Sequence, residues 1–443
     1  MNIVLITASA PPSAGSHATR ISAFIEALTA SENSVTLITC HWAEEQKRRS
    51  TLYSDMARSC EIISTSGGFF RTAARVAVRT ARDGAYSSFL DALRSLARRV
   101  LLPDSFVTWI PGATFAAIRA ARRRANGEST VIVSSGAPFS AHIVGAVASA
   151  ITRIPLVLDY GDPWVYEPGF PKRGLRLWLE RGIERWVLRC ASAVSFTTQA
   201  TADLYRVKYR DVLPLPIVLP MGFDESDFQI ASDTATETCS SGPIRFVYTG
   251  RLTREYRSLS TFASFLAHID SLALTRDDIL FEFYGMEQAR VEDELSEFVR
   301  KGLVIIKESV DHRIFVRTLC DADGVLVFGN NNYIQVPGKI AQCIGARRPI
   351  LYLPNVEDVD RDPSFEVLKR IIVEGVFVCR NRSEFDAALT FVREKKSIVV
   401  NEAAMCELNW NVIGRNLVNV IRLVSDGGKP DKGCGRRNGT ERE

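Results

Sequence analysis

The chain has 443 residues, of which 46% are hydrophobic and 24% are charged, and its formal net charge is +4. These values are ordinary for a globular protein, and the length predicts two domains of about 200 residues each rather than one core. The nine cysteines are scattered without a C-x-x-C pair. This spacing argues against a disulfide framework and against a zinc site, and it predicts a reduced, intracellular protein.

No segment of the sequence has the pattern of a targeting or membrane-spanning element. Residues 1–12 lack a basic n-region and carry too short an apolar run for a signal peptide. No apolar stretch approaches the length needed to cross a bilayer. We therefore expect a cytoplasmic protein.

The first half of the chain alternates short apolar runs with helical segments. A loop that contains Gly15 follows the first run, and a helix is expected from about Thr19 to Ala30. Short apolar runs between turn residues are typical of buried parallel strands. The order predicts a doubly wound α/β domain over residues 1–222, with ligands at the carboxyl ends of its strands. The expected strands are 2–8, 34–40, 130–136, 155–162 and 191–198.

Residues 69–126 form a basic block with eleven arginines, no lysine and three acidic residues. Such a block is either a solvated helix face or an amphipathic surface that rests on anionic lipid, and its phenylalanines and leucines supply the apolar face that the second interpretation needs. Nucleic acid is a weaker alternative, because no aromatic-and-basic binding motif accompanies the charge. The block leaves open a peripheral contact with the inner membrane, and we expect no nucleic-acid partner.

Residues 221–242 are polar, acidic and rich in turn formers, which predicts a hinge between domains. The alternation then restarts and predicts a second doubly wound domain over residues 243–402. A final amphipathic helix is expected over 403–425, and the tail 426–443 is predicted to be disordered because it is poor in apolar residues. The expected strands are 244–250, 279–285, 303–309, 323–329, 349–354 and 375–380.

Motifs for several chemistries are missing from the sequence. Neither half contains G-x-G-x-x-G or a Walker loop, and no H-E-x-x-H or G-x-S-x-G occurs. Asp321 and Asp323 form a D-x-D triplet, but they stand between a helix and a strand, where capping and turn roles are more frequent than metal binding. We therefore expect no metal and no bound cofactor.

Cations stand instead at the expected strand ends of the second domain. The first of these strands ends at Gly250, and Arg251 and Arg257 follow it. In QVPGKIAQCIG, Gly338 lets the backbone approach a ligand closely, and Lys339 begins a helix, where the helix dipole disfavours a cation unless an anion is also bound. The alternative is a solvated lysine at a helix cap. Positively charged side chains that follow two strands of one sheet are suited to bind a diphosphate.

Six stretches, in matching order along nearly the whole chain, resemble motifs of the GT-B glycosyltransferases, specifically of glycosyltransferase family 4. LDYGDPW resembles a D-x-R-D-P-W pattern of one branch, VLPMGFDESDF resembles the I-P-N-G-V-D-x-x-x-F linker, and VPGKIAQCIGARRPIL resembles V-P-x-K-L-F-E-Y-L-A-A-G-K-P-I-L. VLITASAPPSAGSHATR resembles the first strand and its glycine loop. RWVLRCASAVSFTTQATADLY and FVYTGRL resemble the helix and strand before the linker and the first strand of the donor domain.

The resemblance implies a GT-B fold, in which two Rossmann-like domains face a central cleft, and a retaining transfer of a sugar from a nucleoside diphosphate donor. The C-terminal domain would bind the donor and the N-terminal domain the acceptor, without a metal. Arg251 matches the arginine of the family's G-R-L motif, and Lys339 matches the lysine of V-P-x-K. The family's next lysine falls near Tyr256, so Arg257 is the substitute candidate.

The sequence departs from the family at three positions. The family's pair of glutamates, eight residues apart, falls at Ile334 and Gln342, and Gly161 stands where the DRDPW branch has arginine. Gln342 can still hydrogen-bond a ribose hydroxyl, but without charge, whereas Ile334 cannot bond the sugar. These departures leave the identity of the donor, and the activity itself, open.

Candidate residues in the first domain have structural alternatives. Asp162 follows a strand end and would bond a sugar hydroxyl or stabilise an oxocarbenium-like transition state, unless it is an N-cap or turn aspartate. His142 begins a helix beyond another strand end, although a lone histidine is more often structural. Gly15 and Ser16 would bring backbone N–H groups to the diphosphate, or they form a plain turn.

These features favour a cytoplasmic, membrane-peripheral glycosyltransferase that extends a surface polysaccharide or a lipid-linked saccharide. Its partners would be a nucleotide-sugar donor and a saccharide or lipid-linked acceptor. A catalytically silent nucleotide-sugar-binding protein is one alternative, which the missing glutamates permit. A nucleotide-sugar epimerase on the same fold is another, but it would need several carboxylates facing the sugar, and donor-side carboxylates are depleted here.

Overall fold

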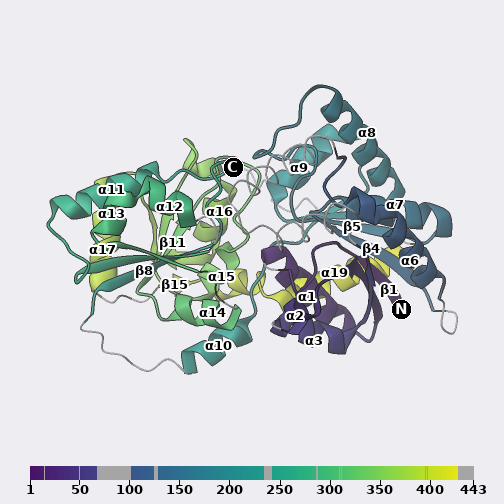
Figure 1. The fold of residues 1–443 in the computed structure, drawn as a ribbon, viewed down its shortest axis with the longest axis horizontal. Helices are drawn as coiled ribbons and strands as arrows, with labels where there is room; N and C mark the ends of the chain where they lie inside the picture. The colour runs from purple at the N-terminus through teal and green to yellow at the C-terminus, as the bar shows by residue number, and fades with distance from the viewer. Residues whose placement is uncertain are drawn as a thin grey trace, which may run out of the picture.

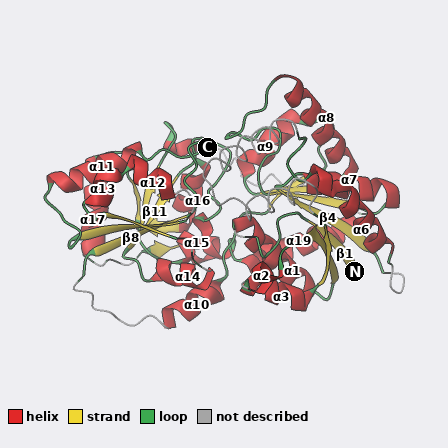
Figure 2. Cartoon of the chain, in the orientation of Figure 1, coloured by secondary structure: helices red, strands yellow, loops and turns green. Residues whose placement is uncertain are grey.

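The computed structural model of the protein describes residues 1–13, 15–48, 50–66, 101–123, 128–233, 242–285, 288–308, 310, 312–394, 396 and 398–427. Two α/β domains lie side by side, each with helices on both faces of an open parallel sheet (Figure 1 and Figure 2). The predicted fold class, two doubly wound domains, is confirmed. Most of the predicted basic block (69–100 and 124–126 of 69–126) and most of the predicted tail (428–443 of 426–443) lie outside the described residues.

The first domain is built on a seven-stranded sheet in the order β3-β2-β1-β4-β5-β6-β7, in which all neighbours are parallel. The strand order reverses between β1 and β4: β1 to β3 extend toward one edge of the sheet, and β4 to β7 extend toward the other. Ligands of such sheets bind at the point where the order reverses. All five strands expected from the sequence form, and β3 and β7 are additional. The strands are β1 (Asn2–Ile6), β2 (Ser34–Cys40), β3 (Glu61–Thr65), β4 (Thr130–Gly136), β5 (Leu156–Tyr160), β6 (Ala193–Phe196) and β7 (Leu215–Val218).

Helices bury both faces of this sheet because each carries an apolar stripe. Side chains of α1 and α3 belong to the core on one face, and those of α6, α7, α8 and α9 to the core on the other. The helices are α1 (Ser16–Ala30), α2 (Glu44–Arg48), α3 (Thr51–Ser59), α6 (Ile110–Arg122), α7 (Ser140–Thr152), α8 (Gly174–Cys190) and α9 (Gln199–Lys208), and a 3-10 turn covers Val107–Trp109.

The second domain repeats this plan with a six-stranded sheet in the order β10-β9-β8-β11-β12-β14, again with parallel neighbours. All six strands expected from the sequence form. They are β8 (Ile244–Thr249), β9 (Ile279–Tyr284), β10 (Val304–Lys307), β11 (Gly324–Phe328), β12 (Ile350–Leu353) and β14 (Val376–Val378), and a small antiparallel pair, β13 (Ile372–Glu374) and β15 (Val399–Val400), is additional.

Helices of the second domain also form two layers (Figure 1). Side chains of α11, α12, α13 and α17 pack on one face of the sheet, and those of α14, α15 and α16 on the other. The helices are α11 (Ser260–Ser271), α12 (Gln288–Glu294), α13 (Ser296–Arg300), α14 (His312–Cys320), α15 (Ile340–Gly345), α16 (Pro363–Ile371), α17 (Arg382–Arg393) and α18 (Glu402–Cys406), with a 3-10 turn at Val359–Arg361.

The chain crosses between the domains twice, and the two crossings pair with each other. The backbone N–H of Phe223 donates to the oxygen of Leu408 at 3.0 Å, and the N–H of Trp410 donates to the oxygen of Phe223 at 3.0 Å. After the second crossing, α19 (Trp410–Ser425) packs against α1 in the core of the first domain. The final helix predicted over 403–425 is thus two helices, α18 and α19, which serve different domains.

The segment predicted as a hinge, 221–242, contains a helix that the sequence analysis did not predict. Helix α10 (Glu225–Asp233) packs against α14, and Phe223 and Phe228 are buried in the core of the second domain. The first crossing is therefore confined to a few residues before Phe223, and the polar composition that suggested an open linker belongs in part to a surface helix.

Helices α1 and α19 cross closely at Gly414, and this contact gives a testable prediction. A Cβ atom at Gly414 would lie 2.2 Å from the Cβ atom of Ala27. We expect Gly414→Ala to destabilise the protein by about 1–3 kcal/mol, because the helices must move apart. In the control Gly182→Ala, on α8, the new Cβ would meet nothing within 4 Å, and alanine favours the helix. Thermal unfolding measures both, and equal melting temperatures would contradict the close crossing.

Only the end of the predicted basic block, residues 101–123, is described. Helix α6 buries an alanine-rich face and leaves Arg122 exposed, and Arg123 pairs with Glu61 at 2.8 Å. This part has the character of a solvated helix face. Contact of the remaining block with lipid stays a prediction. In the described ranges, no helix combines the length and the apolar character needed to cross a membrane.

Candidate functional site

The loop between β11 and α15 bridges the two domains. The backbone oxygen of Ile334 accepts hydrogen bonds from the hydroxyl groups of Thr198 at 2.6 Å and Thr201 at 2.9 Å in the first domain. Gly338 lies against Ser16, because a Cβ atom at Gly338 would come within 2.7 Å of the Ser16 Oγ. The two segments that the sequence predicted to hold a diphosphate, one in each domain, therefore meet.

Gly15 and Ser16 form the start of helix α1. Gly15 has a φ of +119°, a value that favours glycine, and nothing lies within 4 Å of the place where its Cβ atom would be. Gly15 occupies the N-cap position and provides no side-chain cap. The first N–H groups of a helix attract anions, and this exposed turn leaves room for one.

Lys339 stands at the N-cap position of α15, one position before the first helical turn in which the sequence placed it. Its ammonium group lies 3.7 Å from the centroid of the Phe315 ring. Burial lowers the pKa of Lys339 from its ordinary value of 10.5 to about 8. Among the described residues no carboxylate forms an ion pair with it, so none of these residues neutralises its charge. A bound anion would stabilise it.

The loop after β8 presents Arg251 and Arg257 in different environments. Arg251 is exposed. Arg257 donates to the hydroxyl of Tyr248 at 3.4 Å and to the backbone oxygen of Arg251, and its Nε is buried without a hydrogen-bond partner. In the part of the chain that the structure describes, Arg257 has no carboxylate partner. It is therefore the second partly buried cation of this domain whose charge is unbalanced.

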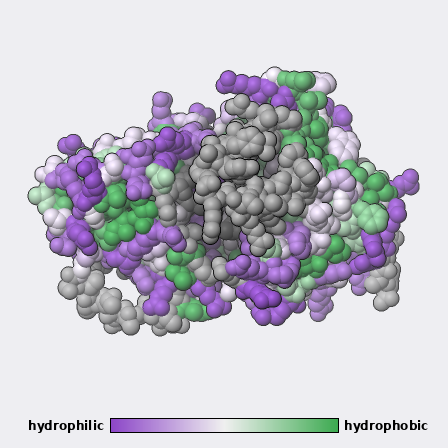
Figure 3. Space-filling model, in the orientation of Figure 1, coloured by the Kyte–Doolittle hydropathy of each residue, from purple (hydrophilic) through white to green (hydrophobic). Residues whose placement is uncertain are grey.

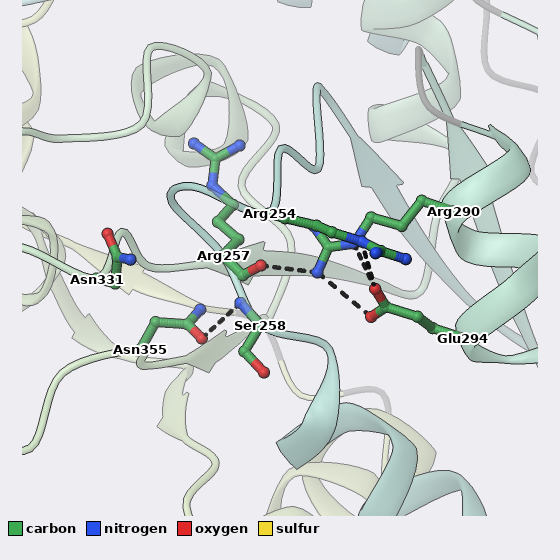
Figure 4. A pocket seen from close by; sticks show the side chains of 7 residues that line it. All are labelled: Arg254, Arg257, Ser258, Arg290, Glu294, Asn331 and Asn355. Atoms are coloured by element: carbon green, nitrogen blue, oxygen red, sulfur yellow. Dashed lines mark hydrogen bonds and ion pairs between the residues drawn. The ribbon is translucent and has the colours of Figure 1, made fainter. Parts of the chain in front are cut away.

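A pocket of about 410 Å³ opens beside this loop (Figure 4). Arg254 and Arg290 point toward Glu294, at 3.1 and 2.8 Å, whereas the Arg257 side chain extends away from them. Neither Arg251 nor Lys339 lines the pocket, so a hollow shared by these two residues stays a prediction. The lining residues are Arg254, Arg257, Ser258, Arg290, Glu294, Asn331 and Asn355.

The resemblance to family 4 aligns Gln342 with a glutamate that would hold the donor ribose. Its side chain is 3% exposed, and its Oε1 has no hydrogen-bond partner among the described residues. A buried amide oxygen without a partner is uncommon, and a ligand hydroxyl is one group that would satisfy it. At the position of the other glutamate, Ile334 uses its backbone oxygen to join the domains, as described above.

A polar network connects the domains around Asp162. The side-chain amide of Gln335 donates to Asp162 at 2.9 Å and to Glu167 at 3.2 Å, and the hydroxyl of Tyr256 donates to Glu167. Asp162 and Glu167 follow β5 in the first domain, whereas Tyr256 and Gln335 follow β8 and β11 in the second. We call Asp162, Glu167, Tyr256 and Gln335 the interdomain carboxylate cluster.

Two carboxyl groups of this cluster hold protons more tightly than usual. Burial raises the pKa of Glu167 from 4.5 to about 7, and the charge of Asp162 adds to the shift. Asp162 is exposed, but protein surrounds it closely enough that desolvation raises its pKa, against the hydrogen bond from Gln335. Glu167 can therefore gain or lose a proton near neutral pH, as acid–base groups of active sites do.

Because the pKa of Glu167 is raised, we expect the free energy of unfolding to fall as pH rises. A carboxyl group with a raised pKa in the folded state keeps its proton where the unfolded chain has lost it, so the folded state loses stability between about pH 4.5 and 7. Glu167→Gln removes this titration, and we expect it to remove up to about 3 kcal/mol of pH dependence. Unfolding in urea across this range measures the effect. The control Glu357→Gln changes an exposed glutamate, and an unchanged slope in Glu167→Gln would contradict the prediction.

Three members of the cluster, Glu167, Tyr256 and Gln335, were not predicted as site residues. One signal was present: Tyr256 stands near the position of the family's second lysine, so a polar role there was foreseeable. Glu167 follows Asp162 by five positions in a turn that contains Pro168 and Gly169. Gln335 precedes the V-P-x-K motif and carries no pattern of its own.

His142 is fully buried in the first domain. Its Nδ1 lies 2.9 Å from the hydroxyl of Ser134, and its ring stacks on Tyr160 with centroids 4.5 Å apart. Burial lowers the pKa of His142 to about 3, so the ring is neutral at neutral pH. These contacts do not bring His142 to the surface between the domains, and a catalytic role for it stays a prediction.

Gly161, which stands where the resembled D-x-R-D-P-W pattern has arginine, has close neighbours in Gly136 and His17. A Cβ atom at Gly161 would lie 3.0 Å from the backbone oxygen of Gly136 and 3.3 Å from the Nδ1 of His17. A side chain at this position would therefore require small shifts of the Gly136 backbone and of His17. Burial lowers the pKa of His17 to about 4, and its Nε2 lies 3.4 Å from the hydroxyl of Thr7. The sequence analysis did not single out His17.

A buried ion pair anchors strand β5, which leads to Asp162. Arg20 of α1 donates to both carboxylate oxygens of Asp159, at 2.6 and 3.0 Å, and both side chains are 0% exposed. The hydroxyl groups of Ser135 and Ser195 each donate to the same carboxylate at 2.6 Å. Burial alone would raise the pKa of Asp159, but the Arg20 charge and these hydrogen bonds outweigh it and lower the pKa to about 2.

In the D-x-D triplet, Asp323 connects two neighbouring strands and Asp321 lies near an arginine. The Asp323 carboxylate accepts a hydrogen bond from the backbone N–H of Arg245 at 2.7 Å, which fixes β11 against β8, and Asp321 lies 3.5 Å from the guanidinium of Arg317. Within the ranges that the structure describes, no three His, Cys, Asp or Glu side chains are grouped so that they could hold a metal ion.

No protein-family model and no curated protein matches the chain. Solved structures do match. Sucrose-phosphate synthase from Thermosynechococcus elongatus superposes with a TM-score of 0.61 at 14% identity, over 97% of this chain and 100% of that one. HepE from Anabaena, in complex with UDP and glucose, superposes with a TM-score of 0.56 at 14% identity, over 96% of this chain and 99% of that one. Trehalose-6-phosphate synthase from Burkholderia multivorans superposes with a TM-score of 0.58 at 10% identity, over 96% of this chain and 99% of that one.

Another structural neighbour is described as a UDP-N-acetylglucosamine 2-epimerase, from Listeria monocytogenes, with a TM-score of 0.55 at 10% identity over 96% of this chain and 97% of that one. At such low identity these similarities establish the fold and not the reaction. The two parallel-sheet α/β domains, with seven and six strands, match these structures. The protein therefore has the GT-B fold.

Proposed function

We propose that the protein transfers a sugar from a nucleoside diphosphate sugar to an acceptor hydroxyl, with the donor diphosphate at the carboxyl edge of the second sheet. One observation carries this proposal: Arg257 and Lys339 are partly buried cations without a carboxylate partner among the described residues. A buried charge is destabilising unless a counter-charge is supplied. In open α/β sheets, ligands bind at this edge.

Each residue of the donor site has a physical role in this proposal. Glycosyl transfer develops positive charge on the sugar and negative charge on the departing phosphate, so cations fixed at that phosphate lower the barrier. Arg257 and Lys339, with Arg251 from the β8 loop, would hold the diphosphate without a metal. Gln342 would bond a ribose hydroxyl, and the turn that begins with Gly15 would offer N–H groups to the same phosphates.

The interdomain carboxylate cluster would serve the sugar and the acceptor. Asp162 would bond a sugar hydroxyl or the incoming acceptor, and Glu167, with its pKa near 7, would take up a proton during the transfer. The resemblance to family 4 favours a retaining reaction and an acceptor that is a saccharide or lipid-linked saccharide of cell-surface polysaccharide synthesis, in the cytoplasm. The complex of HepE with UDP-glucose makes that donor the first to test.

A nucleotide-sugar epimerase is the second candidate, and one observation favours it. Asp162 and Glu167 form a carboxyl pair that was not foreseen when only donor-side acids were considered. An epimerase needs such acid–base groups at the sugar and needs no acceptor. The neighbour from Listeria monocytogenes that is described as an epimerase has a similar fold, which supports this candidate.

The experiment combines binding with product analysis. UDP-glucose and UDP-N-acetylglucosamine are added to the purified protein, without and with saccharide acceptors. We expect the donor to raise the melting temperature and to release UDP slowly without acceptor and faster with it. Epimerisation would give an isomeric sugar nucleotide without UDP release, and a silent binder would give only the thermal shift.

The matched variants are Arg257→Met and Arg382→Met, the second being an exposed arginine on α17. We expect the thermal shift to disappear in the first variant and to persist in the second. If no nucleoside diphosphate sugar raises the melting temperature of the unmodified protein, the proposal is wrong.

A further inference from the structure

Helix α8 is apolar on both sides: Val187 and Leu188 are buried in the core, and other large apolar residues face outward. It buries its two acidic residues, Glu180 and Glu184, which are both 0% exposed, and it exposes Leu175 (72%), Trp178 (72%) and Trp186 (38%). Helices on the surface of globular proteins normally turn their apolar side chains inward and their charges outward. The arrangement of α8 therefore needs an explanation.

Specific partners fix the acidic side of α8 toward the core. Glu180 accepts hydrogen bonds from the indole N–H of Trp164 at 2.9 Å and from Arg176 at 2.6 Å. Glu184 accepts from the hydroxyl groups of Tyr205, at 2.6 Å, and Tyr209. Rotating α8 to bury its tryptophans would leave these groups without partners, which is costly. The hydrogen bonds of Glu180 and Glu184 thus keep the tryptophans on the outer side of α8.

The exposed apolar residues form one line on the outside of α8. Leu175, Trp178, Gly182 and Trp186 follow one another at spacings of three and four residues, which place them on one helix face. Phe170, in the loop before the helix, is 57% exposed and extends the line. Hydrophobic surface runs along α8 in the space-filling view (Figure 3). We call these five residues the α8 outer face.

Exposed arginines flank this face, and Asp211 pairs with Arg185 of α8. Arg173, Arg181 and Arg189 are exposed, and the acidic residues of α8 are both buried. A second copy of the chain on this face would place like charges opposite each other, and residues 67–100, with seven arginines and two aspartates, would do the same. An apolar stripe with tryptophans, flanked by arginines, fits the headgroup region of an anionic bilayer.

We propose that the α8 outer face docks on a membrane surface that contains anionic lipid. This surface is separate from the basic block predicted in the sequence. The face begins beside the interdomain carboxylate cluster, because the ring of Phe170 lies 6.2 Å from the ring of Tyr256, which bonds Glu167. Docking would bring that cluster to the headgroups, where an acceptor carried on a lipid would reach Asp162. Only this last consequence rests on the proposed function.

Flotation with vesicles tests the docking without any nucleotide sugar, so that its outcome is independent of the transferase proposal. The full chain is mixed with vesicles of phosphatidylcholine alone, or of phosphatidylcholine and phosphatidylglycerol in equal parts. We expect binding only to the anionic vesicles. Leu175→Ser and Trp178→Ser should each weaken it about tenfold, through lost apolar burial. Arg181→Gln and Arg189→Gln should each weaken it roughly fivefold.

Control variants alter matched residues in the second domain. Val373→Ser removes a side chain that is 72% exposed, and Arg382→Gln removes an exposed arginine. Both should bind as the unmodified protein does, and circular dichroism confirms that every variant folds. Brominated lipid should quench tryptophan fluorescence in the unmodified protein and less so in Trp178→Ser.

Three outcomes would overturn the proposal. The first is that the unmodified protein does not float with anionic vesicles, and the second is that the α8 variants float as well as the controls. The third is that sedimentation shows a dimer that Trp178→Ser dissociates. The last result would assign the α8 outer face to a second copy of the chain.

Discussion

Arg20→Met is expected to lower the free energy of unfolding by about 3–5 kcal/mol, because it leaves the Asp159 carboxylate charged and buried. The guanidinium of Arg20 also donates to the backbone oxygens of Leu219, at 3.0 Å, and Pro220, at 2.8 Å. The same substitution therefore loosens the chain where it first leaves the first domain. For a domain of this size, the loss corresponds to a fall of about 10 °C in melting temperature.

An exposed ion pair of the same domain is the control. Arg123 and Glu61 lie 2.8 Å apart, but their side chains are 49% and 50% exposed. Arg123→Met should cost less than about 1 kcal/mol, because water replaces the lost partner. Adding Asp159→Asn to Arg20→Met should restore part of the stability, since no buried charge then remains. Equal losses in Arg20→Met and Arg123→Met would show that the buried pair does not act as described.

Lys339→Met is expected to change stability and activity in opposite directions. Without a bound anion, desolvation of the Lys339 ammonium disfavours folding by up to about 3 kcal/mol, and its contact with Phe315 offsets up to about 2 kcal/mol. The variant should therefore gain about 1 kcal/mol of stability. If Lys339 stabilises the leaving diphosphate, turnover should fall about 10²–10³-fold, as it does when one charge-stabilising group is removed from an active site.

The pH dependence of stability identifies the same lysine. A lysine with a lowered pKa in the folded state loses its proton there first, so the unfolded chain binds more protons between about pH 8 and pH 10.5. Stability of the unmodified protein should therefore rise with pH in this window, relative to Lys339→Met. A saturating donor should reduce the rise, because a bound diphosphate favours the charged lysine.

Lys369→Met is the matched control, since the ammonium group of Lys369 also lies over a phenylalanine ring, at 6.0 Å from the centroid of Phe365, but on an exposed position. This variant should retain the pH dependence, the thermal shift and the turnover of the unmodified protein. A loss of stability in Lys339→Met at neutral pH would contradict the description of Lys339 as an unbalanced cation.

Buried central strands were predictable from the sequence because their neighbours on both sides require apolar side chains. Strands β2 and β4 have the bounds predicted for them, 34–40 and 130–136. Two of the strands that were missed, β3 and β7, lie at the edges of the first sheet. Strand β3 has only Ile62 and Ile63 as large apolar residues, and β7 contains Pro216, which central strands exclude. Edge strands are half-exposed, so hydrophobicity alone does not reveal them.

The candidate site was predictable only as far as it depends on single strand ends. Asp162 and Arg257 were named because they follow strands, and Lys339 because it begins a helix. Gln335 could not be assigned to Asp162 and Glu167, from which it is 173 and 168 positions distant in the sequence. Which side chains meet there depends on how the two domains face each other, and a local sequence pattern does not contain that information.

The position of α19 has a consequence for how the chain is made. Trp410, Ile413 and Leu417 complete the core that Ile21 and Phe24 of α1 begin, so the first domain cannot finish folding until the ribosome has synthesised its last helix. Domains usually mature in the order of their synthesis. Here the order is reversed, since the second domain is complete before Trp410 emerges. A nascent chain that stalls before this residue would expose the apolar side of α1 to chaperones and proteases.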